Sequence, residues 1–316
     1  MPDATKNVYM PGIISITFSP CIDKSTCVEE LIPEKKLACA APVLEPGGGG
    51  INVARAIRKL GGTATAIYPS GGYTGKFLDS LMRKEEVPAI VIETISETRE
   101  NIIVFESGKK RQYRFGMPGP TIKETDWRAC LKKLKAAEGF TYFVISGSNP
   151  SGVSLDFYSE AAEIVKEKKG KLVIDTSGDA LKHALSTGIF LAKPNIGELS
   201  NLSGVKELDA GNVVEAAKKI IDTGHCEVLV VSMGPAGAIL VTANEYFHEA
   251  APAIKIKSTV GAGDSMVAGI LIALQKKLSW RDVLRYGVAA GTAATMNAGA
   301  ELCTRENVEK VRAFFS

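Results

Sequence analysis

The feature that most restricts the fold of this chain is an alternation of short apolar runs with longer helical runs, from residue 13 almost to the end. Residues 13–18, 63–68 and 89–95 are apolar enough for buried strands, and the spacing of apolar residues between them predicts helices. The strands are nearly all apolar rather than alternating, which is typical of a parallel sheet covered by helices on both faces. The sequence therefore predicts an α/β fold with a mainly parallel central sheet. Further strands are expected at 142–146, 171–175, 189–193 and 227–232, and helices at 51–60, 75–86, 125–138, 155–168, 262–275, 280–297 and 305–315.

Two segments break this alternation and predict a separate small sheet. Residues 25–45 carry short β-prone runs with no helix between them, and residues 101–115 alternate like a hairpin. Both follow strands of the main sheet, so we expect them to form one small antiparallel sheet that projects as a lid from about 24–46 and 99–116. We expect the lid and the main sheet to form a single domain over residues 1–316. The exposed face of such a lid needs cover, and a second copy of the chain, giving a homodimer, is the simplest cover.

Charge and hydropathy exclude several classes of protein. The 38 Lys and Arg residues against 35 Asp and Glu give a net charge of +3, which is too small for a general nucleic-acid surface. No stretch reaches eighteen consecutive apolar residues, and residues 1–10 lack the pattern of a secretory signal. Six scattered cysteines without a CxxC pair are typical of small buried side chains in a reducing compartment. We therefore expect a cytoplasmic protein that binds neither nucleic acid nor a membrane.

Glycine is over-represented, and the strongest local motif explains part of the excess. There are 31 glycines in 316 residues, against a usual share of about 7%. Four of them are consecutive, at 47–50, and lead directly into a predicted helix that carries Asn52 in its first turn. Such a run is unfavourable unless backbone N–H groups must approach a ligand at the positive end of the helix. A flexible loop is the alternative, but a flexible loop would not adjoin so regular a helix.

A second glycine motif, with Gly261 and Gly263, opens the long apolar helix at 262–275. Glycines there leave N–H groups exposed at a helix N-terminus, which makes an anion hole. Asp264 stands in the first turn of the same helix, where an aspartate is often only a cap or a partner of the helix dipole. Beside an anion hole, the favoured interpretation is a base that accepts a hydroxyl proton while the hole holds developing phosphate charge.

Other polar residues have both a binding and a plain structural interpretation. Asn195 and Glu198, three residues apart at a helix start, predict either a capping box or a site for hydrated Mg²⁺. The loop 232–237 is either a nucleotide-contacting loop or a simple turn. The remaining candidates are Asp23, for sugar hydroxyls or a turn cap, and Arg99 and Lys36 on the lid, for a phosphate or for solvent.

Together these residues carry a resemblance to a known family. The glycine run with Asn52 resembles the first signature of the PfkB (ribokinase-like) carbohydrate kinases, and residues 258–269, with their Gly-Ala-Gly-Asp core, resemble the second. The likeness spans roughly residue 12 to the C-terminus. It implies a ribokinase-like three-layer α/β/α fold with a β lid that dimerises, and an ATP-dependent sugar kinase. Asp23, Lys36 and Arg99, with the whole-length likeness, imply the subgroup that phosphorylates the C1 hydroxyl of fructose 6-phosphate in glycolysis. Tagatose 6-phosphate and fructose 1-phosphate are the alternative substrates.

The resemblance also implies a role for each matching residue. Asp264 matches the catalytic base, and Gly261, Ala262 and Gly263 match the anion hole. The sugar phosphate is implied to contact Asp23, Gly48, Gly49, Asn52, Arg99, Ser148 and Asp264. The nucleotide is implied to contact Lys36, Lys193, Asn195, Ser232, Gly234, Gly237, Val288 and Thr292. Glu198 is implied to act with the Mg²⁺ of ATP, and a K⁺ loop is implied at Ser258, Val260, Ala294, Asn297 and Gly299. Ala38 and Glu301 stand where the subgroup carries basic residues.

Overall fold

The fold is known from a computed structural model that describes residues 12–209 and 211–315. The first eleven residues lie outside this described part, so neither the expected absence of a secretory signal nor the expected start of the domain at residue 1 is addressed by it. Across the described ranges, no helix combines the length and apolarity that a bilayer crossing needs.

The main sheet, within the described residues, has nine strands. They are β1 (Gly12–Ile16), β4 (Ala64–Gly71), β5 (Ala89–Thr94), β8 (Phe140–Ser146), β9 (Lys171–Asp175), β10 (Ile189–Ala192), β11 (Cys226–Ser232), β12 (Ala238–Val241) and β13 (Tyr246–Glu249). Their order is β13-β12-β11-β10-β9-β8-β1-β4-β5. Pairing is parallel from β11 across to β5, and only the pairs β11–β12 and β12–β13, at one edge, are antiparallel. The predicted mainly parallel sheet is therefore confirmed, and its carboxyl ends meet along one edge.

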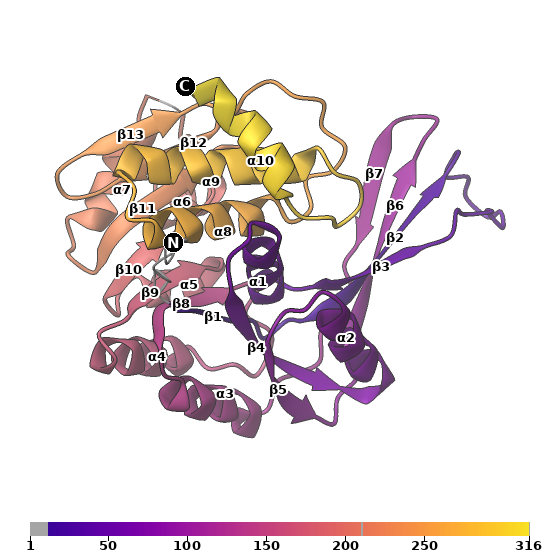
Figure 1. Ribbon diagram of the computed structural model, residues 1–316, viewed down its shortest axis with the longest axis horizontal. Coiled ribbons are helices and arrows are strands. Elements are labelled where there is room, and N and C mark those ends of the chain that lie inside the picture. The colour runs from indigo at the N-terminus through magenta and orange to yellow at the C-terminus, as the bar shows by residue number, and fades with distance from the viewer. Residues whose placement is uncertain (1–11, 210, 316) are drawn as a thin grey trace, which may run out of the picture.

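Helices cover both faces of this sheet (Figure 1). One face carries α1 (Gly49–Lys59), α2 (Gly72–Lys84), α8 (Ala262–Gln275), α9 (Trp280–Thr295) and α10 (Arg305–Arg312), and the other carries α3 (Glu124–Ala136), α4 (Asp156–Glu167), α5 (Gly178–Ala184), α6 (Ile196–Ser203) and α7 (Val213–Ile221). Each face has its own cluster of buried apolar side chains, and inward-facing residues of the strands contribute alternately to the two clusters. The two cores make the three-layer α/β/α arrangement that the sequence predicted. The short helix α5 was not predicted.

Local sequence accounts for where several helices begin and end. α9 begins after Ser279, whose side chain accepts a hydrogen bond from the backbone N–H of Asp282, and α10 begins after Thr304 in the same way. α1 is followed by Gly61 in a left-handed conformation (φ 85°), a common way for a helix to end. Local sequence therefore sets the starts of α9 and α10 and the end of α1.

The small sheet consists of β2 (Cys21–Val28), β3 (Val43–Gly47), β6 (Arg99–Glu106) and β7 (Arg111–Phe115), in the order β3-β2-β6-β7. The outer pairs β2–β3 and β6–β7 are antiparallel, as expected for two hairpin-like excursions. The central pair β2–β6 is parallel, so the expectation of a wholly antiparallel sheet was wrong. Local hairpin signals do not predict how two separate hairpins pair with each other. Here β2 and β6 leave the main sheet in the same direction and therefore pair in parallel.

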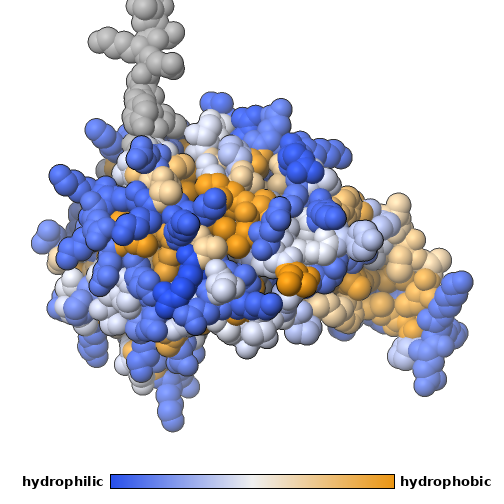
Figure 2. Space-filling view, turned by 90° about the horizontal axis from the view of Figure 1, so that it is seen from below, coloured by the Kyte–Doolittle hydropathy of each residue, from blue (hydrophilic) through white to orange (hydrophobic). Residues whose placement is uncertain are grey.

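The lid projects from the main body, and the face of the lid that is seen in Figure 2 is largely apolar (Figures 1 and 2). Figure 2 shows this apolar surface extending toward a hydrophilic tip. Exposed apolar side chains on and beside the lid include Ile32, Val43, Phe115 and Met117. The segment 29–42, which carries Lys36, forms neither helix nor strand and lies on the lid.

Candidate active site

Asp264 is the centre of the candidate site. It lies in the first turn of α8, which begins directly after Gly261. Gly261 adopts a left-handed conformation (φ 72°) that favours glycine. Burial, with repulsion from the nearby Asp175, raises the pKa of Asp264 to about 7, although hydrogen bonding to Asn52 and the charge of Lys193 lower it. A carboxylate with a pKa near 7 is suited to accept a proton at neutral pH.

The N-terminus of α1 meets Asp264 from the other glycine motif. Asn52, in the first turn of α1, donates from Nδ2 to Asp264 Oδ2 at 2.9 Å, although the two residues are 212 positions apart. Gly48 has φ 107°, and a Cβ on Gly49 would lie 2.5 Å from both the Gly147 nitrogen and the Ser146 Oγ. A side chain at 49 would therefore push the helix away from β8. The glycine at 49 is needed for close approach of α1 to the end of β8, whereas the predicted approach of backbone N–H groups to a ligand stays a prediction.

Asp175 and Lys193 form an ion pair beside Asp264 at the carboxyl ends of β9 and β10. Lys193 Nζ lies 3.0 Å from Asp175 Oδ1, and Lys193 is only 6% exposed. Burial opposes the charge of Lys193, but Asp175, together with Asp264 and Glu198, outweighs burial and holds the pKa of Lys193 above its usual value. Ser146 Oγ lies 3.4 Å from Asp175 and 3.5 Å from Asp264, so it stands between the two carboxylates.

A polar cavity of about 200 Å³ opens at this edge of the sheet. It is lined by Ser146, Gly147, Ser148, Asp175, Thr176, Ser177, Glu198 and Asp264. Burial raises the pKa of Glu198, and the charge of Asp175 adds to this effect. Three carboxylates thus face one cavity, at the carboxyl ends of parallel strands where ligands of open α/β sheets bind.

A second group of polar residues lies where the lid joins the main body. Asp23 on β2 is 6% exposed and accepts a hydrogen bond from Asn101 Nδ2 at 2.9 Å. Arg99, at the start of β6, donates from Nη1 to the Met117 carbonyl at 2.9 Å and from Nη2 to the Ser19 carbonyl at 3.3 Å. The Nε of Arg99 is buried and has no hydrogen-bond partner among the described residues. A buried guanidinium donor in this condition fits an anion that is yet to bind.

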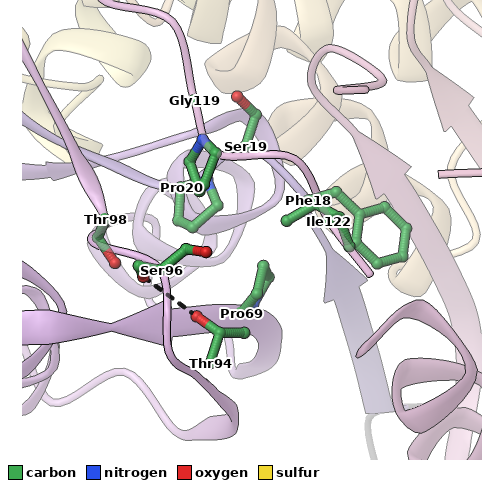
Figure 3. Close-up of a pocket in the computed structure, with 10 residues that line it drawn as sticks. Phe18, Ser19, Pro20, Pro69, Thr94, Ser96, Thr98, Gly119 and Ile122 are labelled. Carbon is green, nitrogen blue, oxygen red and sulfur yellow. Dashed lines mark hydrogen bonds between the residues drawn. The ribbon is translucent and has the colours of Figure 1, made fainter. Parts of the chain in front are cut away.

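A small hollow near Arg99 is a different kind of site (Figure 3). It is lined by Phe18, Ser19, Pro20, Pro69, Thr94, Ser96, Thr98, Gly119, Pro120 and Ile122, and the Thr94 hydroxyl donates to the Ser96 carbonyl across it. Its volume of about 10 Å³ has room for about one water molecule. It is too small for a sugar phosphate.

The residues that the sequence assigned to a nucleotide fall into three groups. Lys193, Asn195, Ser232, Gly234 and Gly237 lie on two adjacent loops, which are joined by a backbone bridge between Asn195 and Ser232. Thr292 and Val288 lie on α9, where Val288 is 1% exposed and packs in the core. Lys36 is exposed on the lid segment 29–42. The first group is brought together, while Lys36 stands apart on the lid.

The comparisons with known proteins agree with this geometry. Residues 12–307 match the model of the pfkB family of carbohydrate kinases. The chain belongs to this family. It is 42% identical over 308 residues to the ATP-dependent 6-phosphofructokinase isozyme 2 of Escherichia coli K12, covering 97% of this chain and all of that enzyme. Crystal structures of phosphofructokinase-2 from Escherichia coli, in complex with fructose-6-phosphate and with potassium, superpose with TM-scores of 0.91 and 0.92 at 40% and 42% identity. Each covers 96% of this chain and 99% of its own.

A pfkB-family kinase that uses ATP needs carboxylates that can bind Mg²⁺, and Glu198 is the candidate beside the cavity. Asn195 and Glu198 form the capping box, since Asn195 N donates to Glu198 Oε2 at 2.8 Å and Glu198 N donates to Asn195 Oδ1 at 2.9 Å. Among the described residues, no group of three or more His, Cys, Asp or Glu side chains is arranged to hold a metal. Mg²⁺ usually takes one or two carboxylates plus water and phosphate oxygens. The site therefore fits a Mg²⁺ that arrives with a nucleotide better than a resident metal.

The loop that the family resemblance assigned to K⁺ is assembled from two segments. Ser258 Oγ donates to the Gly299 carbonyl at 2.6 Å, which joins residues 258–260 to residues 294–299. The lid strand β7 also reaches this loop, because Gln112 Nε2 donates to Ser258 Oγ at 3.0 Å. Asn297 Nδ2 donates to the Leu302 carbonyl at 2.8 Å, so the side chain of Asn297 is already engaged in the loop.

Two polar residues of this kinase site were missed by sequence reasoning. Asp175 was counted only as the end of a strand, although a carboxylate at the carboxyl end of a predicted parallel strand is a recognisable signal. Asn101 was counted only as part of a hairpin, and nothing in the local sequence connects it to Asp23. It is the parallel pairing of β2 with β6 that sets Asp23 opposite Asn101.

Proposed function

We propose that this chain is an ATP-dependent 6-phosphofructokinase, which phosphorylates the C1 hydroxyl of fructose 6-phosphate to give fructose 1,6-bisphosphate in glycolysis. The observation that carries the proposal is Asp264, whose pKa of about 7 and contact with Asn52 suit a general base beside a glycine-rich helix start. The full-length similarity to an enzyme of that name, and to a structure of phosphofructokinase-2 with fructose-6-phosphate, supports the choice of substrate.

In the proposed reaction, Asp264 removes the proton of the C1 hydroxyl as the hydroxyl oxygen attacks the γ-phosphorus of ATP. The new O–P bond forms while the bond to the β-phosphate oxygen breaks, so ADP leaves and the released proton stays on Asp264 until solvent removes it. The N–H groups of Gly261, Ala262 and Gly263, at the positive end of α8, stabilise the negative charge on the transferring group. Phosphoryl transfer depends mostly on such positioning and charge stabilisation.

The sugar phosphate is proposed to bind between the lid and the N-terminus of α1. Arg99, with its unpartnered Nε, grips the 6-phosphate, and Asp23 accepts hydrogen bonds from sugar hydroxyls. The other proposed contacts are Gly48, Gly49, Asn52 and Ser148. Closure of the lid over this site would exclude water and limit ATP hydrolysis.

The nucleotide is proposed to lie along the carboxyl ends of β10 and β11, against Lys193, Asn195, Ser232, Gly234, Gly237, Val288 and Thr292, with Lys36 reaching it from a lid. Mg²⁺ enters with ATP near Glu198 and supplies charge neutralisation on the phosphates. K⁺ is proposed at the loop of Ser258, Val260, Ala294, Asn297 and Gly299, beside the anion hole. The potassium complex of phosphofructokinase-2 from Escherichia coli supports this proposal.

The apolar face of the lid supports a homodimer, which we propose to act in the cytoplasm. Val43 is 59% exposed and Phe115 is 46% exposed, which is unusual for large apolar side chains on a projecting sheet. We propose that two lids cover each other. A tetrameric inhibited form of phosphofructokinase-2 from Escherichia coli is known, so light scattering with and without MgATP should be used to determine the assembly.

The test is a coupled ADP-release assay with fructose 6-phosphate, tagatose 6-phosphate, fructose 1-phosphate and ribose. We expect fructose 6-phosphate to give the highest kcat/KM, and Asp264→Asn to abolish ADP release with all four. Preference for tagatose 6-phosphate or fructose 1-phosphate would replace the substrate but keep the sugar-phosphate kinase. Preference for ribose would contradict the proposed phosphate site. Repeating the assay at high MgATP tests for inhibition by the nucleotide.

A further inference from the structure

Arg55 on α1 is a buried charge that the proposed reaction does not use. Its side chain is 0% exposed, and it is the largest fully buried side chain of the described part of the chain. Its guanidinium makes a bidentate pair with Glu85, from Nε at 2.8 Å and from Nη2 at 2.6 Å. Nη2 also lies 3.3 Å from Glu45 Oε1, and Nη1 donates to the Pro46 carbonyl at 2.5 Å. Arg55 therefore joins α1 to the end of α2 and to the lid strand β3.

Arg55 also touches the candidate site through Asn52. Nη1 of Arg55 lies 3.4 Å from Asn52 Oδ1, and Asn52 Nδ2 donates to Asp264 Oδ2 at 2.9 Å. An asparagine amide has a donor end and an acceptor end, and rotation by 180° exchanges them. A guanidinium only donates, and an ionised carboxylate only accepts. Only one orientation of the Asn52 amide satisfies both neighbours, so the two charges on either side of it fix that orientation.

Stability alone gives little reason for a charge at this position. A buried ion pair is often no more stabilising than well-packed apolar residues of similar volume, and it is retained in some proteins because it fixes one geometry. Burial raises the pKa of Glu45 even though Arg55 lowers it, which indicates that desolvation at this cluster is not fully offset. What Arg55 does provide is a fixed donor for the acceptor end of Asn52.

We propose that Arg55 is a positioning residue that holds the Asn52 amide with its nitrogen toward Asp264 and ties this orientation to the lid strand β3 through Glu45 and Pro46. The inference rests on the proposed function only in taking Asp264 as the base. Without Arg55, the Asn52 amide is free to rotate, and Asp264 loses its hydrogen-bond donor. The anionic form of Asp264 is then less stable, so its pKa rises.

Within the described residues, the other groups that face Asp264 do not contact Arg55, so we expect them to stay in place when Arg55 is changed. They are Asp175 at the end of β9, Lys193 after β10, the hydroxyl of Ser146 and the thiol of Cys21, whose pKa burial and then Asp23 hold well above its usual value. None of them contacts Arg55 in the described structure. A change in the titration of Asp264 would therefore report on Asn52.

The test is Arg55→Lys, which keeps the positive charge but cannot span Asn52, Glu85 and Pro46 as a planar fork does. Arg58→Lys is the matched control, because Arg58 lies one turn along α1 and pairs with Glu86 at the surface. Two quantities are measured for each variant: the pH dependence of kcat/KM, and the pKa of Asp264 from ¹³C NMR of its carboxyl without substrate. Asp264→Asn assigns the NMR signal, and a thermal melt checks folding.

We expect Arg55→Lys to move both midpoints upward by about one pH unit, which is the size of one lost hydrogen bond to a charged group. We expect kcat/KM to recover at high pH, and Arg58→Lys to match the wild type. A loss of activity that is the same at every pH, or a folded Arg55→Lys with an unchanged pKa of Asp264, would overturn the inference. If no sugar phosphate is turned over but the NMR midpoint still rises, the proposed function fails and the inference stands.

A second variant covers the case in which Arg55→Lys does not fold. Glu85→Gln loosens the anchor of Arg55 and also removes a negative charge. Removal of the charge alone lowers the pKa of Asp264, whereas release of Arg55 raises it. An upward shift in Glu85→Gln therefore supports the positioning role, and a downward shift contradicts it.

Discussion

Replacing Asp175 by Asn tests the electrostatic origin of the raised pKa of Asp264. Ser146 Oγ is 3.4 Å from Asp175 Oδ2 and 3.5 Å from Asp264 Oδ1. The sum of these two distances is therefore the largest possible separation of the two carboxylate oxygens. At about 7 Å and an effective dielectric constant of about 20, two like charges repel by about 2.4 kcal/mol, or nearly two pKa units. Water in the open cavity and Lys193 screen part of this repulsion, so we expect a downward shift of about one unit.

The assay is the pH dependence of kcat/KM, which reports the ionisation of the free enzyme and free substrate. Asp264 must be deprotonated to accept a proton, so the rate rises with pH through its pKa of about 7. In Asp175→Asn the midpoint should fall to near pH 6, and the freed charge of Lys193 acts in the same direction. The phosphate of the substrate titrates near pH 6 as well. It contributes equally to both enzymes, so the difference between them isolates Asp264.

In the pH dependence of kcat/KM, the plateau rate and the midpoint report different properties of the enzyme. Asp175 lines the cavity and pairs with Lys193, so a lower plateau rate in Asp175→Asn is expected and decides nothing. Asp222→Asn is the control, because it removes the same charge at the exposed end of α7 and should leave the midpoint unchanged. An unchanged or higher midpoint in Asp175→Asn would show that the group titrating near pH 7 is not Asp264 under the influence of Asp175.

Three further substitutions test other parts of the site. Asp264→Asn should lower kcat by several orders of magnitude with little change in KM. The pKa of Asp264 is raised in the folded state, so its ionisation weakens the fold as pH rises from the unfolded-state pKa near 4 to the folded-state pKa of about 7. Urea denaturation should therefore show Asp264→Asn to be more stable than the wild type at pH 8, by about 2 kcal/mol after allowance for partial exposure. At pH 4 the variant should not be more stable. Arg99→Ala should raise KM for the sugar phosphate about tenfold or more and leave KM for ATP nearly unchanged, and an unchanged KM for the sugar phosphate would refute the phosphate role. Gly49→Ala should destabilise the fold by about 1–3 kcal/mol in denaturant titrations, because its Cβ would lie 2.5 Å from the Gly147 nitrogen. The control Gly116→Ala should not destabilise the fold, because a Cβ at position 116 would have no atom within 4 Å.

The sequence was most informative where chemistry demands an unusual residue. The four glycines at 47–50 and the Gly261-Ala262-Gly263 segment stand out because glycine is costly without a reason, and both prove to be helix starts at the site. The parallel main sheet could be predicted because its strands lack polar alternation. These signals are local, and each can be recognised without knowing the rest of the fold.

The sequence was least informative where a residue has meaning only through a distant partner. Asp175, Asn101 and Arg55 are ordinary residue types in ordinary positions, and their partners lie far along the chain. Arg55 in particular falls in a helix whose apolar spacing predicts burial, with no local sign that Glu45 and Glu85 converge on it. The parallel pairing of β2 with β6 escaped prediction for the same reason, because hairpin signals describe neighbours and not the joining of two excursions.

The close approach of α1 to β8, which the glycine run permits, also contributes to the raised pKa of Asp264. Because Gly49 has no side chain, α1 approaches β8 closely enough for Asn52 to reach Asp264 across the site. The same closeness removes water from Asp264, and burial is the largest contribution to its raised pKa. A bulkier residue at 49 would hold the helix away and admit water, which lowers the pKa of Asp264, while loss of the hydrogen bond from Asn52 raises it. Burial is the larger effect, so the net shift is toward the usual acidic value. Gly49, which we propose to contact the substrate, therefore also helps to set the pKa of Asp264, the proposed base.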